Sequence, residues 1–303
     1  MVGWGAPRES SPPPKVLGVF GPTASGKSAV AAALADRLGT EVVSADAMQV
    51  YRQIPILTNQ PDRPTRLVAI RDLTEEMSVA EYAGHAHEAI DELVARAGVA
   101  VVAGGTGLYF RAALGELDIP PAPEPGTRER LQAIYDADPA LAYARLTELD
   151  PEAAAIVHRN DGRRVVRALE LAEMGASIVP REAELWSAAT RHPSVIVGLD
   201  VPREVLERRI RERTNSMLAR GLLDEVRAVG ALRPSRTAEK ALGLRELREL
   251  PVETALEQLA ARTIRYAAYQ RKWMRRIQGI VMIDADRPPQ EVADAILEVA
   301  RAR

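Results

Sequence analysis

Short apolar runs recur along the chain, and helical patterns separate the first three of them. An unbroken run of about five apolar residues between turn-forming residues is typical of a strand buried on both faces. Such runs occur at 16–20, 41–45, 99–103, 195–199 and 280–284. The separating helical stretches are 27–38 and 79–97. Because strands that alternate with helices favour a parallel sheet, the pattern predicts an α/β fold with helices on both faces of the sheet.

A long segment without strand signals interrupts this pattern between Gly115 and Pro193. We therefore expect a helical insertion domain over 116–194, set into a core formed by 15–115 and 195–303. Within the insertion, a proline-rich start at 118–126 precedes helices expected at 127–137, 139–149, 151–157 and 161–174. Further helices are expected at 203–219, 221–231, 239–249 and 253–277. Residues 1–14, rich in proline and serine, are expected to form a flexible tail.

The first apolar run leads into a glycine-rich loop that fully matches the phosphate-binding P-loop pattern G-x-x-x-x-G-K-[ST]. Its residues are Gly21, Pro22, Thr23, Ala24, Ser25, Gly26, Lys27 and Ser28. The strand-like run before the loop and the helical stretch after it, closed by Gly39, supply the context that the motif needs. Strand, loop and helix in this order aim backbone N–H groups at an anion. The sequence therefore predicts a P-loop that binds a phosphorylated ligand, with a chance glycine-rich turn as the alternative.

Two further strand ends carry candidate site residues. Asp46 directly follows the run 41–45, at the carboxyl edge where open parallel sheets bind ligands. A simple capping role for this aspartate is the alternative. The run 99–103 ends in Gly-Gly-Thr, residues 104–106, where nucleotide hydrolases and many kinases carry a metal-binding aspartate. The missing carboxylate argues against an ordinary ATPase and leaves Asp46 as the best placed acid.

Charge is distributed unevenly along the chain. The net charge is −2, but the first 150 residues carry −7 and the rest carry +5. This asymmetry is compatible with a polyanion that contacts mainly the C-terminal half. The chain has no cysteine, which excludes disulfides, a thiolate nucleophile and cysteine-ligated metal sites, and its four histidines form no metal-binding pattern.

The ordered motifs resemble the tRNA dimethylallyltransferase (tRNA isopentenyltransferase) family. The resemblance rests first on GPTASGKS at 21–28, D-x-x-Q-x-Y at 46–51 and GGTGLY at 104–109. It continues in RRVVRALE (163–170), RIRERTNSMLARGLLDEV (209–226), KALGLRE (240–246) and YAAYQRKWMRR (266–276). It spans Val16 to about Asp286, and it implies transfer of a dimethylallyl group from its diphosphate to N6 of the adenine just 3′ of the anticodon.

The chemistry of this transfer assigns roles to the site residues. The adenine N6 amine is a poor nucleophile, and Asp46 is the candidate general base that accepts its proton. Charge grows on the departing diphosphate, so donors must face its oxygens. Loop N–H groups of residues 23–28, Lys27, and a Mg²⁺ ion held partly by Ser28 would supply them. The resemblance further implies that Thr106 donates near the bridging oxygen and that Arg213 reaches the diphosphate.

RNA recognition is expected to use a different set of residues. Gln49 is placed to read the adenine edge, with an ordinary surface glutamine as the alternative. The resemblance implies tRNA contacts at Asp46, Ala47, Met48, Gln49, Arg128, Arg163, Arg164, Val165, Val166, Arg167, Lys240 and Gly243. The stretch 262–276 holds six basic residues and no acidic one, with aromatic residues interleaved, which suits phosphate contact and stacking. Of those aromatic residues, Tyr269 and Trp273 are expected in the core.

Several positions depart from the family pattern. Ala47 stands where serine is usual, Leu244 where tyrosine is common, and Ala268 and Tyr269 where a Lys-Arg pair is usual. These departures bear on the RNA contacts more than on the reaction.

Three classes of function remain open from the sequence. The first is prenyl transfer to tRNA, with the anticodon stem-loop and dimethylallyl diphosphate as partners. The second is an ATP-dependent small-molecule kinase, and the third is a non-catalytic RNA-binding or nucleotide-switch protein. Transfer to free AMP is a variant of the first. No signal peptide or long apolar span is visible, so we expect a soluble, cytoplasmic monomer that does not enter membranes.

Overall fold

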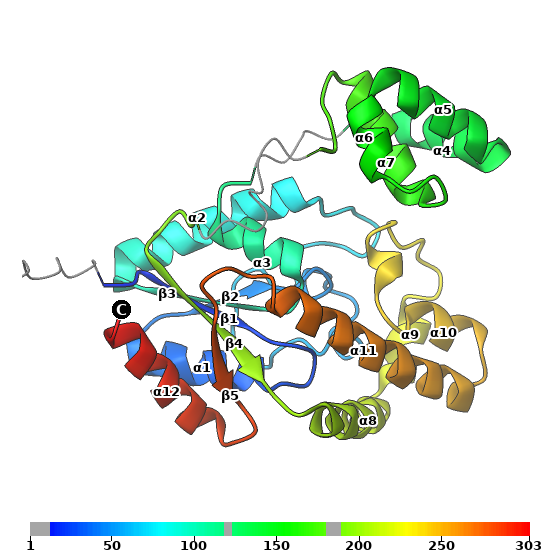
Figure 1. Cartoon of the computed structure of the whole chain (residues 1–303). Helices are drawn as coiled ribbons and strands as arrows, with labels where there is room; N and C mark the ends of the chain where they lie inside the picture. Colours follow the sequence, from blue (N-terminus) through cyan, green and yellow to red (C-terminus); the bar gives the residue numbers. More distant parts are fainter. Residues whose placement is uncertain (1–12, 118–122, 180–188) are drawn as a thin grey trace, which may run out of the picture. The chain divides into compact units, whose positions relative to one another are not determined.

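A computed structural model describes residues 13–117, 123–179 and 189–303 (Figure 1). In these ranges a five-stranded parallel sheet has the order β2–β3–β1–β4–β5. Its strands are β1 (Val16–Phe20), β2 (Val42–Ala45), β3 (Ala100–Gly104), β4 (Ser194–Asp200) and β5 (Val281–Asp284). All five expected strands are therefore confirmed, with bounds that differ by at most one residue.

Each face of the sheet carries its own apolar core, because alternate strand residues point to opposite faces. On one face Leu17 and Val19 belong to a cluster with residues of α1 (Lys27–Leu38) and α12 (Pro289–Arg301). On the other face Val16 and Phe20 belong to a cluster with α2 (Val79–Ala97) and α3 (Gly107–Leu114). Helices on both faces of a parallel sheet are thus confirmed (Figure 1).

The remaining helices of the core follow β4 in the chain. They are α8 (Arg203–Ala219), α9 (Leu222–Ala228), the 3₁₀ helix η2 (Ala238–Lys240), α10 (Leu244–Glu249) and α11 (Val252–Met274). The prediction of one continuous helix over 239–249 is wrong, because Gly243 has a φ of 92° and separates η2 from α10. Its φ lies in the left-handed region, which interrupts a right-handed helix. The helices α3 and α12 lie outside the stretches expected to be helical.

The carboxyl ends of the three neighbouring strands β1, β2 and β3 meet at one edge of the sheet. Gly104 is in register with both Phe20 and Ala45, and the N–H of Gly21 donates to the carbonyl of Gly104 at 3.2 Å. A Cβ at Gly104 would lie against the Ala45 backbone, so only glycine permits this approach. The P-loop, the segment from Asp46 and the turn that contains Thr106 therefore start side by side.

The chain divides into two compact units, one of Met1–Glu116 and Trp186–Arg303 and the other of Leu117–Leu185. The helices described in the second unit are α4 (Thr127–Ala137), α5 (Pro139–Leu149), α6 (Pro151–Ile156) and α7 (Gly162–Glu173). An aspartate precedes each of α5, α6 and α7, and its carboxylate accepts a backbone N–H of the first turn. Leu131, Leu146 and Leu169 lie in the apolar core of this unit.

Candidate active site

The P-loop connects β1 directly to the first turn of α1. Gly26 precedes the helix with a φ of 85°, and Ala24 has a φ of 66°, so both take the left-handed conformation. The N–H of Val30 donates to the carbonyl of Gly26, which leaves the N–H groups of Gly26, Lys27 and Ser28 without a helical acceptor. These three donors and the positive end of the helix dipole make the loop an anion site.

Two N–H groups among residues 23–28 already have acceptors within the chain. The N–H of Thr23 donates to Gln270 Oε1 at 2.8 Å, and the N–H of Ser25 donates to the carbonyl of Pro22 at 3.1 Å. The expectation that all N–H groups of residues 23–28 serve a phosphate is therefore too broad. Sequence reasoning missed Gln270, whose signal in the sequence is an amide on the mostly apolar face of a helix.

Three charged side chains from separate segments act on one another at the P-loop edge. Burial lowers the pKa of Lys27, while Asp46 opposes that shift and Arg213 adds to it. Burial likewise lowers the pKa of Arg213, against the opposing effect of Asp46. The Nε of Arg213 is buried without a hydrogen-bond partner among the described residues. Two partly desolvated cations around one carboxylate form a site suited to an additional anion.

Asp46 combines a turn-capping contact with this charged environment. Its Oδ1 accepts the N–H of Met48 at 2.9 Å, as the capping alternative predicts. Neighbouring Ala47 donates its N–H to Thr106 Oγ1 at 3.4 Å, which links the segment to the start of α3. The Tyr266 hydroxyl lies 3.3 Å from the same Oγ1. Burial, and to a smaller extent Asp46, raises the pKa of Tyr266 to about 12, so this phenol stays protonated at neutral pH.

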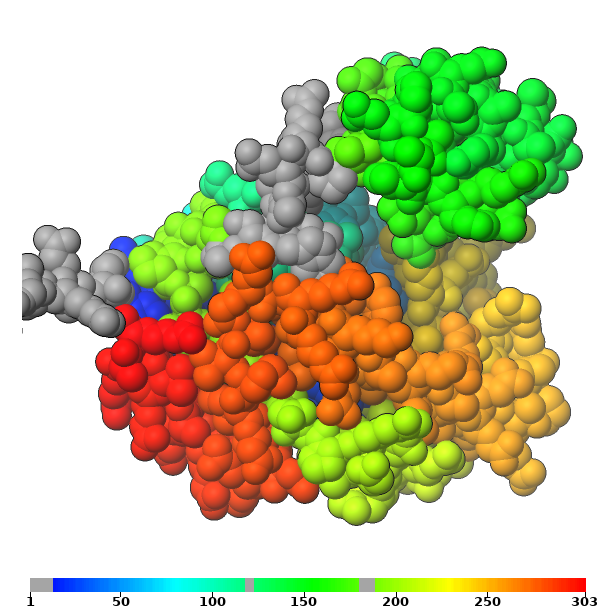
Figure 2. Space-filling model, in the orientation of Figure 1, coloured from blue at the N-terminus to red at the C-terminus, as the bar shows by residue number. Residues whose placement is uncertain are grey.

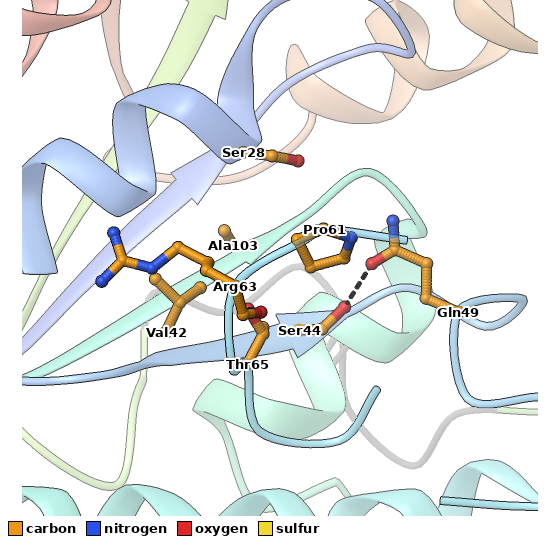
Figure 3. A pocket seen from close by; sticks show the side chains of 8 residues that line it. All are labelled: Ser28, Val42, Ser44, Gln49, Pro61, Arg63, Thr65 and Ala103. Atoms are coloured by element: carbon orange, nitrogen blue, oxygen red, sulfur yellow. Dashed lines mark hydrogen bonds between the residues drawn. The ribbon is translucent and has the colours of Figure 1, made fainter. Parts of the chain in front are cut away.

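Gln49 lies in a small pocket beside the P-loop. Its Oε1 accepts from Ser44 Oγ at 2.9 Å (Figure 3), and its Nε2 donates to the carbonyl of Asn59 at 3.0 Å. Ser28, at the start of α1, faces this pair across the pocket. The cavity measures about 30 Å³, and its lining is Ser28, Val42, Ser44, Gln49, Pro61, Arg63, Thr65 and Ala103. The Gln49 amide thus bonds to the loop that contains Asn59. Its expected recognition of the adenine edge stays a prediction.

The expected RNA-binding residues of α4 and α7 differ in their surroundings. Arg163 and Arg164 are exposed on the first turn of α7. Arg167 and Arg128 form ion pairs with Glu170, whose side chain is fully buried. Val165 and Val166 lie in the core of the helical unit, which leaves their side chains no surface for RNA. All of these residues belong to the second unit, whereas Lys27, Asp46, Thr106 and Arg213 meet in the first.

Two further expected RNA-binding positions lie next to α10. Lys240 is exposed in η2. Gly243 has a structural requirement of its own, because a Cβ there would lie 2.9 Å from Leu259, in addition to its positive φ. Leu244, which replaces the family tyrosine, is buried and packs in the apolar core.

The aromatic residues of α11 divide between surface and core. The expectation of a buried Tyr269 is wrong, because this residue is 55% exposed. Trp273 is half-buried, and a Cβ at Gly107 would collide with its indole ring. Its Nε1 donates to the Tyr269 hydroxyl at 2.9 Å, so the contact that the spacing suggests exists at the boundary of the core. Figure 2 shows the outer surface of α11, in orange, next to α8, in yellow-green.

Clusters of metal-binding side chains and membrane-spanning helices were looked for in the part of the chain that the structure describes. Within the described ranges, no three histidine, cysteine, aspartate or glutamate side chains gather as metal ligands would. Among the helices that the structure describes, none has the length and apolar character to cross a membrane.

Comparison with known proteins places these features in a family context. The model of the IPP transferase family matches residues 49–277. A curated tRNA dimethylallyltransferase of Streptomyces coelicolor is 42% identical over 88% of this chain and 89% of its own length. The solved tRNA isopentenylpyrophosphate transferase of Bacillus halodurans has 29% identity and a TM-score of 0.68, covering 95% of this chain and 97% of its own. A eukaryotic dimethylallyltransferase structure, described as acting on tRNA, has 26% identity and a TM-score of 0.73 over 90% of this chain and 74% of its own.

Proposed function

The chain belongs to the IPP transferase family, and on this premise we propose that it transfers a dimethylallyl group from dimethylallyl diphosphate to N6 of the adenine immediately 3′ of the anticodon in tRNA. The observation that carries the proposal is the joint placement of Asp46, Lys27 and Arg213 at the P-loop edge. A carboxylate beside two cations offers a proton acceptor next to a diphosphate site, which is what this reaction needs.

The donor half of the site would bind the diphosphate. The N–H groups of Gly26, Lys27 and Ser28 have no helical acceptor, and Lys27 and Arg213 supply positive charge. As the allylic C–O bond breaks, its electron pair leaves with the diphosphate, and these groups stabilise the growing charge. Thr106 lies at the same edge and would donate near the bridging oxygen.

The acceptor half centres on Asp46. The N6 nitrogen forms the new bond to the allylic carbon and loses one proton, which the Asp46 carboxylate would take. The contact to Met48 uses Oδ1, and a proton can be accepted at Oδ2. The hydrogen bonds from Ala47 to Thr106 and from Met48 to Asp46 would hold this carboxylate next to the donor site.

A Mg²⁺ ion would complete the donor half. Mg²⁺ keeps several water ligands and binds mainly through substrate phosphates, so one protein oxygen suffices to place it. The exposed hydroxyl of Ser28, in the first turn of α1, fits that requirement. The ion supplies charge neutralisation on the diphosphate oxygens when bound.

The tRNA anticodon stem-loop would contact Arg163 and Arg164 and the basic stretch of α11. Exposed arginines on a helix surface suit phosphate contacts. The target adenine must leave its stack to reach a carboxylate at the sheet edge. We propose a cytoplasmic, monomeric enzyme, in keeping with a substrate that is a free tRNA.

One experiment separates this reaction from phosphoryl transfer. The protein is incubated with tRNA and dimethylallyl diphosphate, the tRNA is digested, and the nucleosides are analysed by mass. We expect adenosine that has gained one dimethylallyl unit. A parallel incubation with labelled ATP tests the kinase alternative, and label transfer without prenylated adenosine would contradict the proposal.

A further inference from the structure

A buried glutamine joins the two loops that surround the proposed diphosphate site. Gln270, on α11, is only 1% exposed. Its Oε1 accepts the N–H of Thr23 in the P-loop at 2.8 Å, and its Nε2 donates to the carbonyl of Gly105 at 2.9 Å. One amide thus bonds to two segments that are far from it and from each other in the sequence. A buried amide with both ends bonded fixes the positions of its partners, because breaking either bond leaves a desolvated polar group.

The same face of α11 contacts three consecutive residues of the turn after β3. Gln270 meets Gly105, the Tyr266 hydroxyl lies 3.3 Å from Thr106 Oγ1, and the Trp273 ring covers Gly107. These three residues of α11 are spaced by four and three positions, which places them on one side of the helix.

The Gln270 side chain and the P-loop backbone both pack directly against Gly105 and leave no space for a side chain there. A Cβ at Gly105 would collide with Gln270 Nε2 and would lie 2.7 Å from the carbonyl oxygen of Gly21. The P-loop, the turn and α11 are therefore in direct contact at this point. A shift of the Gln270 amide would move the P-loop relative to the turn that presents Thr106.

We propose that Gln270 is a positioning residue for the transfer reaction. It holds the P-loop and Thr106 at the distance from each other that one bound diphosphate requires. The inference rests on the proposed function, since it concerns the same donor site. Gln270 does not touch the substrate; it acts through the Thr23 N–H and the Gly105 carbonyl.

Two substitutions test the role. Gln270→Met keeps the length of the side chain and removes both hydrogen bonds. Gln270→Glu keeps an acceptor for Thr23 but, when ionised, cannot donate to Gly105. Gln258→Met is the matched control, because Gln258 lies exposed on the same helix. Each protein is assayed for binding of inorganic diphosphate, for binding of a tRNA anticodon stem-loop and for single-turnover rate.

We expect Gln270→Met to weaken diphosphate binding about tenfold and to lower the single-turnover rate about 100-fold, the order of loss that small misplacements cause. Stem-loop affinity should change by less than about twofold. For Gln258→Met, the two affinities and the single-turnover rate should likewise change by less than about twofold. A Gln270→Met protein with the wild-type rate and diphosphate affinity would overturn the proposal.

The pH dependence of Gln270→Glu separates positioning from mere structural support. A protonated carboxyl has an O–H donor and a carbonyl acceptor, as the amide does. The rate of Gln270→Glu relative to the wild type at the same pH should therefore rise as the pH falls. A ratio that is constant with pH would contradict the role, and this measurement also decides the matter should Gln270→Met fail to fold. If the wild type itself prenylates no tRNA, the proposed function fails, whereas the diphosphate-binding comparison still tests Gln270.

Discussion

Asp46 shows how one side chain can satisfy two interpretations of a sequence. Its position after a strand suggests either a cap or a catalytic acid. The structure shows the capping contact and a charged environment in which the proposed base would act. Oδ1 accepts the Met48 N–H, while the charge of the carboxylate acts on Lys27 and Arg213. The two roles use different properties of the group, so a substitution can separate them.

Asp46→Asn keeps the oxygen that bonds to Met48 and removes the proton acceptor. We expect the single-turnover rate to fall about 10²- to 10⁴-fold, the usual contribution of a positioned base. Melting temperature and both substrate affinities should remain close to those of the wild type, because the turn is preserved. The control is Asp62→Asn, since Asp62 is fully exposed. A near-normal rate in a stable Asp46→Asn protein would end the general-base assignment.

Lys27→Ala and Arg213→Ala should each weaken the binding of inorganic diphosphate about 10- to 100-fold. This is the loss that corresponds to one hydrogen bond between charged groups. Stem-loop affinity should change little, because these cations belong to the donor half of the site. Isothermal titration with each ligand measures both effects, and Lys15→Ala, at an exposed position, is the control. Loss of stem-loop binding with intact diphosphate binding would contradict the assignment of Lys27 and Arg213 to the diphosphate-binding half of the site.

At the scale of elements, apolar runs located all five strands of the described ranges. Four of these, β1 to β4, are buried on both faces, and such strands need continuous apolar sequence. The apolar runs could not locate Gln270, since its two partners come from segments that only the folded sheet brings to α11. Tyr269 was misplaced for a related reason. Its spacing to Trp273 places the two residues on the same side of the helix. The spacing does not indicate which of the two is covered by the core. The amphipathic pattern of α12, with Val292 and Ile296 one turn apart, was readable in the sequence and was missed.

Two glycines in helices allow a matched test of packing between elements. Gly107→Ala places a methyl group against the Trp273 ring, so we expect a loss of about 1–3 kcal/mol in the free energy of unfolding. Gly84→Ala, in the exposed middle of α2 with open space around it, should gain about 0.5–1 kcal/mol. Denaturant unfolding of both variants provides the measurement. Equal effects at the two sites would mean that α11 does not pack tightly on α3.

At the scale of the whole molecule, the two compact units contribute different parts of the proposed function. The first holds the groups that would act on the diphosphate and on N6, and the second presents exposed arginines on α7. The basic residues of α7 have unequal roles, because Arg167 pairs with buried Glu170 and Arg163 and Arg164 do not.

Joint substitution of Arg163 and Arg164 by alanine should raise KM for tRNA and leave the melting temperature unchanged. The slope of log affinity against log salt should become shallower by about one for each RNA phosphate that the variant no longer neutralises. Arg167→Ala is the contrasting variant. It removes one of two partners of buried Glu170 and should lower the stability of the helical unit. An unchanged salt slope in the double variant would mean that Arg163 and Arg164 are solvent-exposed residues that do not contact RNA phosphates.

The stability of the whole molecule should depend on Glu41 in acid. Hydrogen bonds from Arg66, and then from Arg96, lower the pKa of Glu41 from 4.5 to about 2. A carboxyl with a lower pKa in the folded state contributes stability above pH 4.5, which is lost as the pH falls towards 2. Glu41→Gln should therefore destabilise the protein at neutral pH and flatten its loss of stability between these values. Urea unfolding at a series of pH values tests this, and an unchanged slope would contradict it.

The strand order has a consequence for how the polypeptide reaches its native state. Central β1 pairs Val16 with Ala100 on one side and with Ser194 on the other, so the sheet closes only after long intervening segments have been synthesised. The helices α4 to α7 instead make contacts within a short stretch of sequence. Because local contacts form faster than distant ones, the helical unit should acquire structure on the ribosome before β4 has been synthesised and can pair with β1.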